Sequence, residues 1–318
     1  MCTRMDTRTT TRHLLGLRDM PKSRILGLLE AAESYLPVVK GQASPHDDLQ
    51  GHIIANLFLE NSTRTRVSFS VAAQRLGATT IDLLGSTSSA SKGETLVDTG
   101  RNIEAMGVSA IVLRTSASGG AHLLAQHVDV PVINAGDGRS EHPTQGLLDT
   151  MALTQHLGTT DLEGRTIGIV GDIAHSRVAR SAAYALTTLG ADVVFIGPPA
   201  MVPGSMTELT GHDSDGQSVL HVSHDLDAAL PHLDAAMMLR VQFERGANIT
   251  SDYAAHFGMN AERAKRMPEH ACIMHPGPIN RGLELTPDVA DGSRSVILRQ
   301  VTCSVAMRMA VLFEQLAH

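Results

Sequence analysis

Four side chains with hydroxyl or guanidinium groups stand together near residue 60 and could hold a phosphate group: Ser62, Thr63, Arg64 and Thr65. The apolar run 53–58 before them predicts a buried strand, and apolar residues at helical spacing after them predict a helix over 64–76. A helix N-terminus offers unpaired N–H groups and a positive dipole end, which attract a phosphate dianion. The alternative is an ordinary Ser/Thr cap beside solvated arginines. We favour the anion site because the Arg64 guanidinium and three hydroxyls share one strand-to-helix turn.

Two further basic residues follow in the first half of the chain. Lys92 is the single lysine of a loop of small polar residues, 86–95. A solvated surface lysine is the default, but this loop is too small and polar to pack, which favours a functional role. Arg114 closes an apolar run that predicts a strand. It is either the first solvated position after that strand or a second cation that clamps the phosphate and a carbonyl oxygen of one ligand.

A histidine and a glutamine stand at the start of another predicted helix. Gly136 and Gly138 allow a tight loop before His142, and Pro143 suits the first helical turn, with Gln145 one turn further in. A single histidine before a proline is usually structural. The residues alone therefore leave the role of His142 open.

Two arginines occupy separate turns in the second half. Arg177 follows the apolar run 166–171, where the GxGxxG spacing of a dinucleotide site is absent. Arg240 follows another apolar run, and alternation places Arg240 and Gln242 on one face of an extended strand. Two arginines from separate loops fit a dicarboxylate, with one guanidinium at each end.

The elements that position these residues alternate between strands and helices, which predicts an α/β fold: two doubly wound parallel-sheet domains joined by helices. The expected strands are 52–58, 79–84, 109–114, 131–134, 166–171, 192–197, 219–222, 234–239 and 271–274. The expected helices are 23–36, 64–76, 94–106, 120–127, 143–157 and 296–316. Ligands of parallel sheets collect at the carboxyl ends of strands, where three of the polar segments lie.

Composition excludes several classes of partner. A chain of 318 residues suits two domains of about 150 residues each. Its net charge of -7 argues against nucleic acid and against an anionic membrane surface. No apolar run reaches the ~18 residues of a membrane span, and no signal-peptide pattern follows the start. We expect residues 1–12 to form a flexible tail or an assembly arm.

Cysteine and histidine spacing gives no sign of a metal site. Cys2, Cys272 and Cys303 are far apart and form no CxxC pattern, so we expect neither a disulfide framework nor a Cys-based zinc site. The 16 histidines include no HExxH or comparable spacing. We expect no cofactor and a reducing, cytoplasmic location.

Six segments resemble, in order along the chain, the motifs of the transcarbamoylase family, whose two main branches use aspartate or ornithine. These motifs are FxxxSTRTRxSF from 58, SSASKGETLVDT from 88, NAGDGxxxHPTQ from 134, GDxxHSRVARS from 171, RVQ from 240 and HPGP from 275. The resemblance extends from about residue 13 to residue 315. Gly277 departs from it, since some members have Leu at this position. If backbone carbonyls of this loop reach the carbamoyl amide, as the resemblance implies, glycine preserves that contact.

The resemblance implies a role for each motif residue. The residues implied to bind carbamoyl phosphate are Ser62, Thr63, Arg64, Thr65, Ser88, Lys92, Arg114, His142, Gln145, Pro276, Gly277 and Pro278. Those implied to bind aspartate are Lys92, Arg177, Arg240 and Gln242. Those implied to act in catalysis are Arg64, Thr65, Arg114, His142 and Lys92.

The aspartate branch fits this chain better than the ornithine branch. Aspartate has two carboxylates and calls for two cationic partners, whereas ornithine has one carboxylate and a cationic side chain. Ornithine members typically carry HCLP and SMG motifs, and both are absent here. The resemblance thus implies transfer of a carbamoyl group to L-aspartate, early in pyrimidine synthesis. The alternatives are a transcarbamoylase for another amine and a catalytically silent assembly or regulatory subunit.

The resemblance also implies an organisation. Residues 1–142 together with about 297–318 would form a carbamoyl-phosphate domain, and 143–296 an aspartate domain, with the C-terminal helix returning to the first. Homotrimers are expected, in which Ser88 and Lys92 reach the site of the adjacent subunit. A regulatory or dihydroorotase-like chain is a further expected partner.

Overall fold

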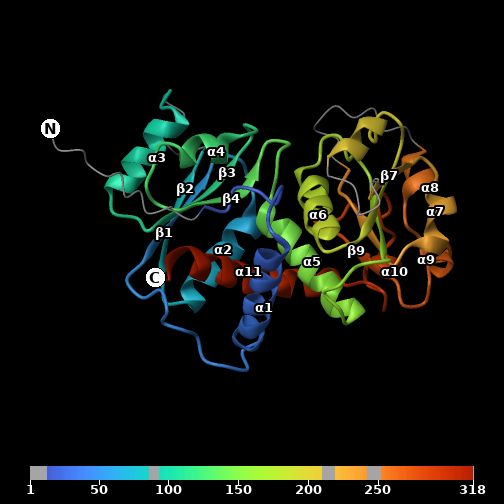
Figure 1. Ribbon diagram of the computed structural model, residues 1–318, viewed down its shortest axis with the longest axis horizontal. Helices are drawn as coiled ribbons and strands as arrows, with labels where there is room; N and C mark the ends of the chain where they lie inside the picture. The colour runs from blue at the N-terminus through green and yellow to red at the C-terminus, as the bar shows by residue number, and fades with distance from the viewer. Residues whose placement is uncertain (1–12, 86–92, 210–218, 242–251, 318) are drawn as a thin grey trace.

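Two parallel β-sheets, one in each half of the chain, organise the protein (Figure 1). The structure is a computed structural model that describes residues 13–85, 93–209, 219–241 and 252–317. The first sheet has the order β2-β1-β3-β4 and the second the order β7-β6-β5-β8-β9. The strands of the first sheet are β1 (Ile53–Phe58), β2 (Thr79–Leu84), β3 (Ala110–Thr115) and β4 (Val132–Asp137). Those of the second are β5 (Thr166–Val170), β6 (Asp192–Ile196), β7 (Leu220–Ser223), β8 (Ala235–Met238) and β9 (Cys272–Met274).

Helices connect the parallel strands and cover the sheets. In the first half they are α1 (Lys22–Val39), α2 (Thr63–Arg75), α3 (Leu96–Ala105), α4 (Gly120–Ala125) and α5 (Pro143–Leu157). In the second half they are α6 (Arg177–Thr188), α7 (Leu226–Ala229), α8 (Tyr253–Phe257), α9 (Ala261–Arg266), α10 (Pro287–Ala290) and α11 (Ile297–Leu316), with 3₁₀ turns at Gly204–Glu208 and Leu230–His232. The predicted doubly wound α/β fold with two parallel sheets is confirmed.

The side chains of β1 alternate between the two faces of the first sheet, and this shows why both faces need helices to cover them. Ile54 and Phe58 belong to one buried cluster, and Ala55 and Leu57 belong to another on the opposite face. A strand that is apolar on both faces must be covered on both, which is typical of doubly wound sheets. The larger cluster continues into the second sheet, so the two halves share apolar packing.

Two helices join the halves. α5 lies between the sheets and contacts α6 on one side and β4 on the other (Figure 1). α11, drawn in red, returns from the second half and packs against α1, α2 and α5. The predicted return of the C-terminal helix to the first half is therefore confirmed.

The start and end of α5 follow from its sequence. Pro143 occupies the first turn, where its missing N–H is not needed, and Gly158 ends the helix with a left-handed φ of 71°. These signals explain why the predicted range 143–157 matches the observed helix. α7 to α10 were not predicted, because such short helices give only a weak helical period.

One predicted strand ends earlier than expected. β8 stops at Met238, level with Val170 at the end of its neighbour β5. Arg240 therefore lies in a loop beyond the sheet edge, and its predicted place on a strand face is wrong. Gln242, the other residue of that prediction, lies outside the described residues. In the described part of the chain, no helix is long and apolar enough to cross a membrane.

Close contact between α5 and α6 leads to a prediction about two glycines. A β-carbon on Gly146 would lie 2.7 Å from the backbone oxygen of Ser181, whereas one on Gly27 of α1 would meet nothing within 4 Å. Alanine is a better helix former than glycine by about 1 kcal/mol. We expect Gly27→Ala to raise the free energy of unfolding by up to about 1 kcal/mol. Gly146→Ala should lower it by about 1–3 kcal/mol, because the helices cannot separate without cost.

Urea unfolding of the two variants beside the unchanged protein measures this difference. Equal stabilisation by both substitutions would contradict the tight approach of α5 and α6.

Candidate active site

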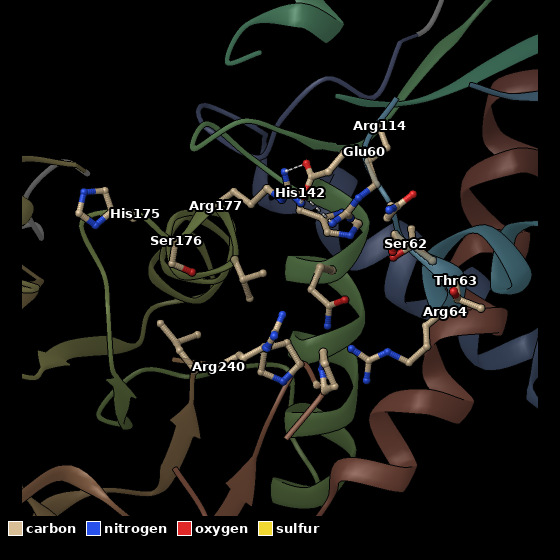
Figure 2. A pocket seen from close by; sticks show the side chains of 18 of the residues that line it. Glu60, Ser62, Thr63, Arg64, Arg114, His142, His175, Ser176, Arg177 and Arg240 are labelled. Atoms are coloured by element: carbon tan, nitrogen blue, oxygen red, sulfur yellow. Dashed lines mark hydrogen bonds and ion pairs between the residues drawn. The ribbon is translucent and has the colours of Figure 1, made fainter. Parts of the chain in front are cut away.

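A cleft of about 500 Å³ lies between the two sheets (Figure 2). Residues of both halves line it. Of the predicted site residues, those that line the cleft are Ser62, Thr63, Arg64, Thr65, Arg114, His142, Gln145, Arg177, Arg240, Pro276, Gly277 and Pro278. Ser88, Lys92 and Gln242 lie outside the described residues. The structure thus brings together every predicted site residue that it describes.

The topology of the sheets explains this gathering. In the first sheet the strand order reverses at β1 and β3, and in the second it reverses at β5 and β8. Crevices form at such points beyond the carboxyl ends of the strands. The segment 60–65 follows β1, Arg114 lies near the end of β3, Arg177 follows β5 and Arg240 follows β8. The cleft therefore combines the crevice of the first sheet with the crevice of the second.

Arg64 and Arg240 point toward one another from opposite sides of the cleft (Figure 2). Burial lowers the pKa of Arg64, and the charge of Arg240 lowers it further. Gly277 makes room for Arg64: its φ is 66°, and a β-carbon there would overlap Nη1 of the guanidinium. A larger residue at 277 is therefore disfavoured by backbone conformation, and it would displace the Arg64 guanidinium.

Glu60 binds two of the predicted cationic residues and was not predicted. Its Oε1 and Oε2 accept from Nη2 and Nη1 of Arg177, both at 2.9 Å, in a bidentate pair. Nη2 of Arg114 donates to Oε1 at 3.3 Å. Glu60 thus links β3 of the first half to α6 of the second. Its place within the FxxxSTRTRxSF segment, two positions after the end of β1, was the available signal.

Two histidines in or beside the cleft are neutral. His142 is 3% exposed, and burial together with the nearby charges of Arg114, Arg177 and Arg308 holds its pKa well below the usual value. His275 is 1% exposed, and burial lowers its pKa to about 3. Its contact with Glu284 at 3.9 Å is consequently not an ion pair. A neutral imidazole can donate a hydrogen bond to a carbonyl oxygen without adding a further positive charge.

The far wall of the cleft has a second acidic group. Asp172 is 8% exposed and accepts from the His175 backbone N–H at 3.3 Å, and its Oδ1 lies 2.9 Å from Nδ1 of the same residue. Ser176 caps α6 through its side chain, which accepts from the backbone N–H of Ala179. These residues belong to the predicted GDxxHSRVARS motif, although only Arg177 was singled out there.

The cleft is positively charged on balance. Among its described lining residues, four arginines face two carboxylates, those of Glu60 and Asp172. In the described part of the chain, no three His, Cys, Asp or Glu side chains gather as they would around a metal ion. The chemistry that the site offers is therefore the binding of anions by guanidinium, hydroxyl and helix N–H groups.

Comparisons with known proteins agree with these motifs. Residues 12–155 match the family model of the aspartate/ornithine carbamoyltransferase carbamoyl-P binding domain, and residues 163–314 match that of the Asp/Orn binding domain. A relative from Myxococcus xanthus, named aspartate carbamoyltransferase catalytic subunit, is 51% identical over 305 residues, which are 95% of this chain and 98% of that protein.

Solved structures share the fold. Aspartate transcarbamoylase from Trypanosoma cruzi, in complex with carbamoyl aspartate and phosphate, matches with a TM-score of 0.85 at 29% identity, over 95% of each chain. Ornithine carbamoyltransferase from Pyrococcus furiosus matches with a TM-score of 0.85 at 31% identity, over 95% of this chain and 96% of that one. The fold alone is thus similar to both branches.

The neutral state of His275 leads to a prediction about pH. An unfolded histidine takes up a proton below about pH 6.5, whereas native His275 stays neutral down to about pH 3. Its contribution to stability is therefore present above pH 6.5 and is lost as the pH falls. Between pH 7 and pH 5, we expect the unchanged protein to lose about 2 kcal/mol more unfolding free energy than His275→Gln.

Urea unfolding at pH 7, 6 and 5 measures this loss. Stability curves that run parallel for the two proteins would mean that His275 has the same pKa in the native and unfolded states.

Proposed function

Because the chain belongs to the aspartate/ornithine carbamoyltransferase family, we propose that it transfers the carbamoyl group of carbamoyl phosphate to L-aspartate. The products are N-carbamoyl-L-aspartate and phosphate, a step of pyrimidine synthesis. The observation that carries this proposal is the cleft that Arg64 and Arg114 of the first half share with Arg177 and Arg240 of the second. The first pair suits a phosphorylated donor and the second pair suits an acid with two carboxylates.

Carbamoyl phosphate binds first in the proposed mechanism. Its phosphate lies at the N-terminus of α2, where the Ser62 side chain makes no capping hydrogen bond to the helix and Arg64 lies on the first turn. Its carbonyl oxygen faces Thr65, Arg114 and neutral His142. Each of these groups donates a hydrogen bond, so all of them stabilise negative charge on that oxygen.

Aspartate binds on the side of the second sheet, with its carboxylates on Arg177 and Arg240. Glu60 holds the Arg177 guanidinium through both terminal nitrogens, so a substrate carboxylate either shares this arginine with Glu60 or displaces it. The two substrates then face one another across the cleft. Holding them in attack geometry supplies a large part of the rate enhancement.

The reaction itself needs no protein nucleophile. The uncharged α-amine of aspartate attacks the carbonyl carbon and forms the new C–N bond. The C–O bond to phosphate breaks, and phosphate leaves with the electron pair and takes up the amine proton. Donors that already point at the oxyanion stabilise the tetrahedral intermediate, which is usually the largest catalytic contribution.

The two halves of the chain correspond to the two substrates. We assign residues 1–142 and about 297–318 to a carbamoyl-phosphate domain and 143–296 to an aspartate domain. The packing of α11 on α1 and α2 supports the inclusion of the C-terminal helix in the first domain.

A homotrimer with shared sites is part of the proposal. The motif SSASKGET, with Ser88 and Lys92, resembles the loop that reaches a neighbouring subunit in the family. A groove of about 350 Å³ between α2 and α11 adjoins Arg64, and Val67 and Val301 line it at 47% and 52% exposure. Such exposed apolar residues beside a site suit a surface that a second subunit covers.

The location and further partners are also proposals. The cysteine pattern supports a reducing, cytoplasmic compartment, since Cys272 and Cys303 are both free thiols in the structure. A regulatory or dihydroorotase-like chain remains the expected further partner, on the resemblance of the motifs alone.

Turnover of the purified chain tests the reaction. We expect N-carbamoyl-L-aspartate from carbamoyl phosphate and L-aspartate, and no citrulline from ornithine. Arg64→Ala should lower kcat/KM about 100- to 1,000-fold, because it removes a guanidinium donor to the phosphate. The matched control is Arg66→Ala on the same helix, whose side chain pairs with Asp82 outside the cleft.

Near-native turnover by Arg64→Ala would refute the phosphate assignment. Turnover with ornithine in place of aspartate would support the other branch, and no turnover with either amine would support a silent subunit.

Mixed oligomers test the shared site. Arg64→Ala and Lys92→Ala subunits should each be inactive alone, because each lacks one part of every site. Mixing them should restore partial activity, since some sites then receive an intact Arg64 from one subunit and an intact Lys92 from its neighbour. Oligomers shown by mass to be mixed, yet still inactive, would mean that each subunit holds a complete site.

A further inference from the structure

A buried polar cluster lies directly behind the cleft, outside the set of residues assigned to the reaction. Asp149 on α5 is 1% exposed and Gln300 on α11 is 3% exposed. Oδ1 of Asp149 accepts from Nε2 of Gln145 at 2.8 Å and from Nε2 of Gln300 at 2.7 Å. Gln145, one turn before Asp149 on α5, also lines the cleft. The cluster thus connects a cleft residue to the protein interior.

The carboxylate of Asp149 is held at an energetic cost. Burial raises its pKa to about 7, against the opposite effects of the two glutamine hydrogen bonds and the charge of Arg308. Arg308 is itself 2% exposed, and its guanidinium lies over the ring of Phe69, 5.0 Å from the centroid. Within the described part of the chain, Oδ2 of Asp149 has no hydrogen-bond donor. A buried acid of this kind constrains its neighbours strongly, because few groups can satisfy it.

The constraint acts on the direction of two side-chain amides. Both glutamines donate to the same oxygen, Oδ1 of Asp149, so each turns its NH₂ group toward this residue. The Oε1 atom of Gln300 then accepts from the backbone N–H of His275 at 3.0 Å, at the start of the loop 275–278. The Oε1 atom of Gln145 is left as an acceptor for the cleft. One carboxylate therefore sets the polarity of both amides.

We propose that Asp149 and Gln300 are positioning residues that hold Gln145 as a hydrogen-bond acceptor and so select a carbamoyl group over other acyl groups. The proposal rests on the proposed function. A carbamoyl group carries an NH₂ donor beside its carbonyl, and Oε1 of Gln145 accepts from it. Acetyl phosphate has a methyl group in that place and would leave the acceptor unpaired. Sites built around a hydrogen bond reject analogues that lack it far better than apolar pockets do.

Asp149→Asn tests the proposal with little change in size. A neutral amide can donate as well as accept, so Gln145 is free to reverse and to present NH₂ to the cleft. We expect the KM of carbamoyl phosphate to rise about 10- to 100-fold. The Ki of acetyl phosphate, measured as a competitive inhibitor, should change less than about twofold, because its methyl group makes no hydrogen bond. The preference for carbamoyl over acetyl phosphate then falls, and the Kd of inorganic phosphate stays unchanged.

The matched control is Thr150→Val. Thr150 is the next residue on α5, is 1% exposed, and donates from Oγ1 to the Gly146 carbonyl at 2.8 Å. This variant loses a buried hydrogen bond of the same helix without touching Gln145. It should lower the melting temperature but keep the native preference for carbamoyl over acetyl phosphate. The control thus distinguishes a reoriented Gln145 from a general loss of stability.

A second variant covers the case in which Asp149→Asn does not fold. Gln300→Met keeps the acid but removes one of its two donors and the acceptor of the His275 N–H. It should shift the preference in the same direction. A folded Asp149→Asn or Gln300→Met protein with the native preference would overturn the proposal. If the unchanged protein transfers no carbamoyl group to aspartate, the proposed function itself fails, which is a distinct result.

Discussion

Four guanidinium groups share one cleft, and the surrounding residues accommodate their like charge. Like charges that are partly removed from water destabilise one another strongly. Burial and the charge of Arg240 lower the pKa of Arg64, and burial together with nearby arginines lowers the pKa of His142 and of His275. Glu60 offsets part of the positive charge by pairing with Arg177 and Arg114. The remaining charge calls for anions, and a phosphorylated donor with a dicarboxylic acceptor supplies them.

The fold holds these charges at fixed positions. Each sheet supplies two of the arginines, at the point where that sheet reverses its strand order. Arg114 lies on β3 itself, and Arg240, Arg64 and Arg177 stand two to seven positions after the end of a strand, so a rigid strand sets the position of each group. α5 and α11 then fix one sheet relative to the other, and α5 carries Gln145 in its first turn. Substrates with two reacting ends are suited to a site of this kind, because each sheet holds one of them.

A second polar layer supports the first from behind. Glu141, which is 8% exposed, accepts from the backbone N–H groups of Leu17 and Arg18 and from the hydroxyl of Ser181. Asp149 does the same for the two glutamine amides. Both acids are buried, and burial raises the pKa of each. A buried acid that accepts several hydrogen bonds fixes the orientation of the groups that donate them. A site that binds its ligands by hydrogen bonds needs such fixed orientations.

The sequence by itself determined the fold class, most element boundaries and the polar segments of the site. Long apolar runs and helical periods are local signals, so β1 and α5 could be placed to within a residue. Glycine and proline at 136, 138 and 143 marked the turn before His142 for the same reason. The family motifs then identified twelve residues that line the cleft in the structure.

Only the tertiary structure decided how these segments act on one another. Glu60 and Asp149 carry no motif of their own, and their importance arises from partners 117 and 151 positions away. The room that Gly277 leaves for Arg64, and the loop position of Arg240 beyond the end of β8, likewise depend on where neighbouring strands stop. Periodicity describes a residue's own element, whereas burial, charge pairing and pKa depend on residues that come close only when the chain has folded.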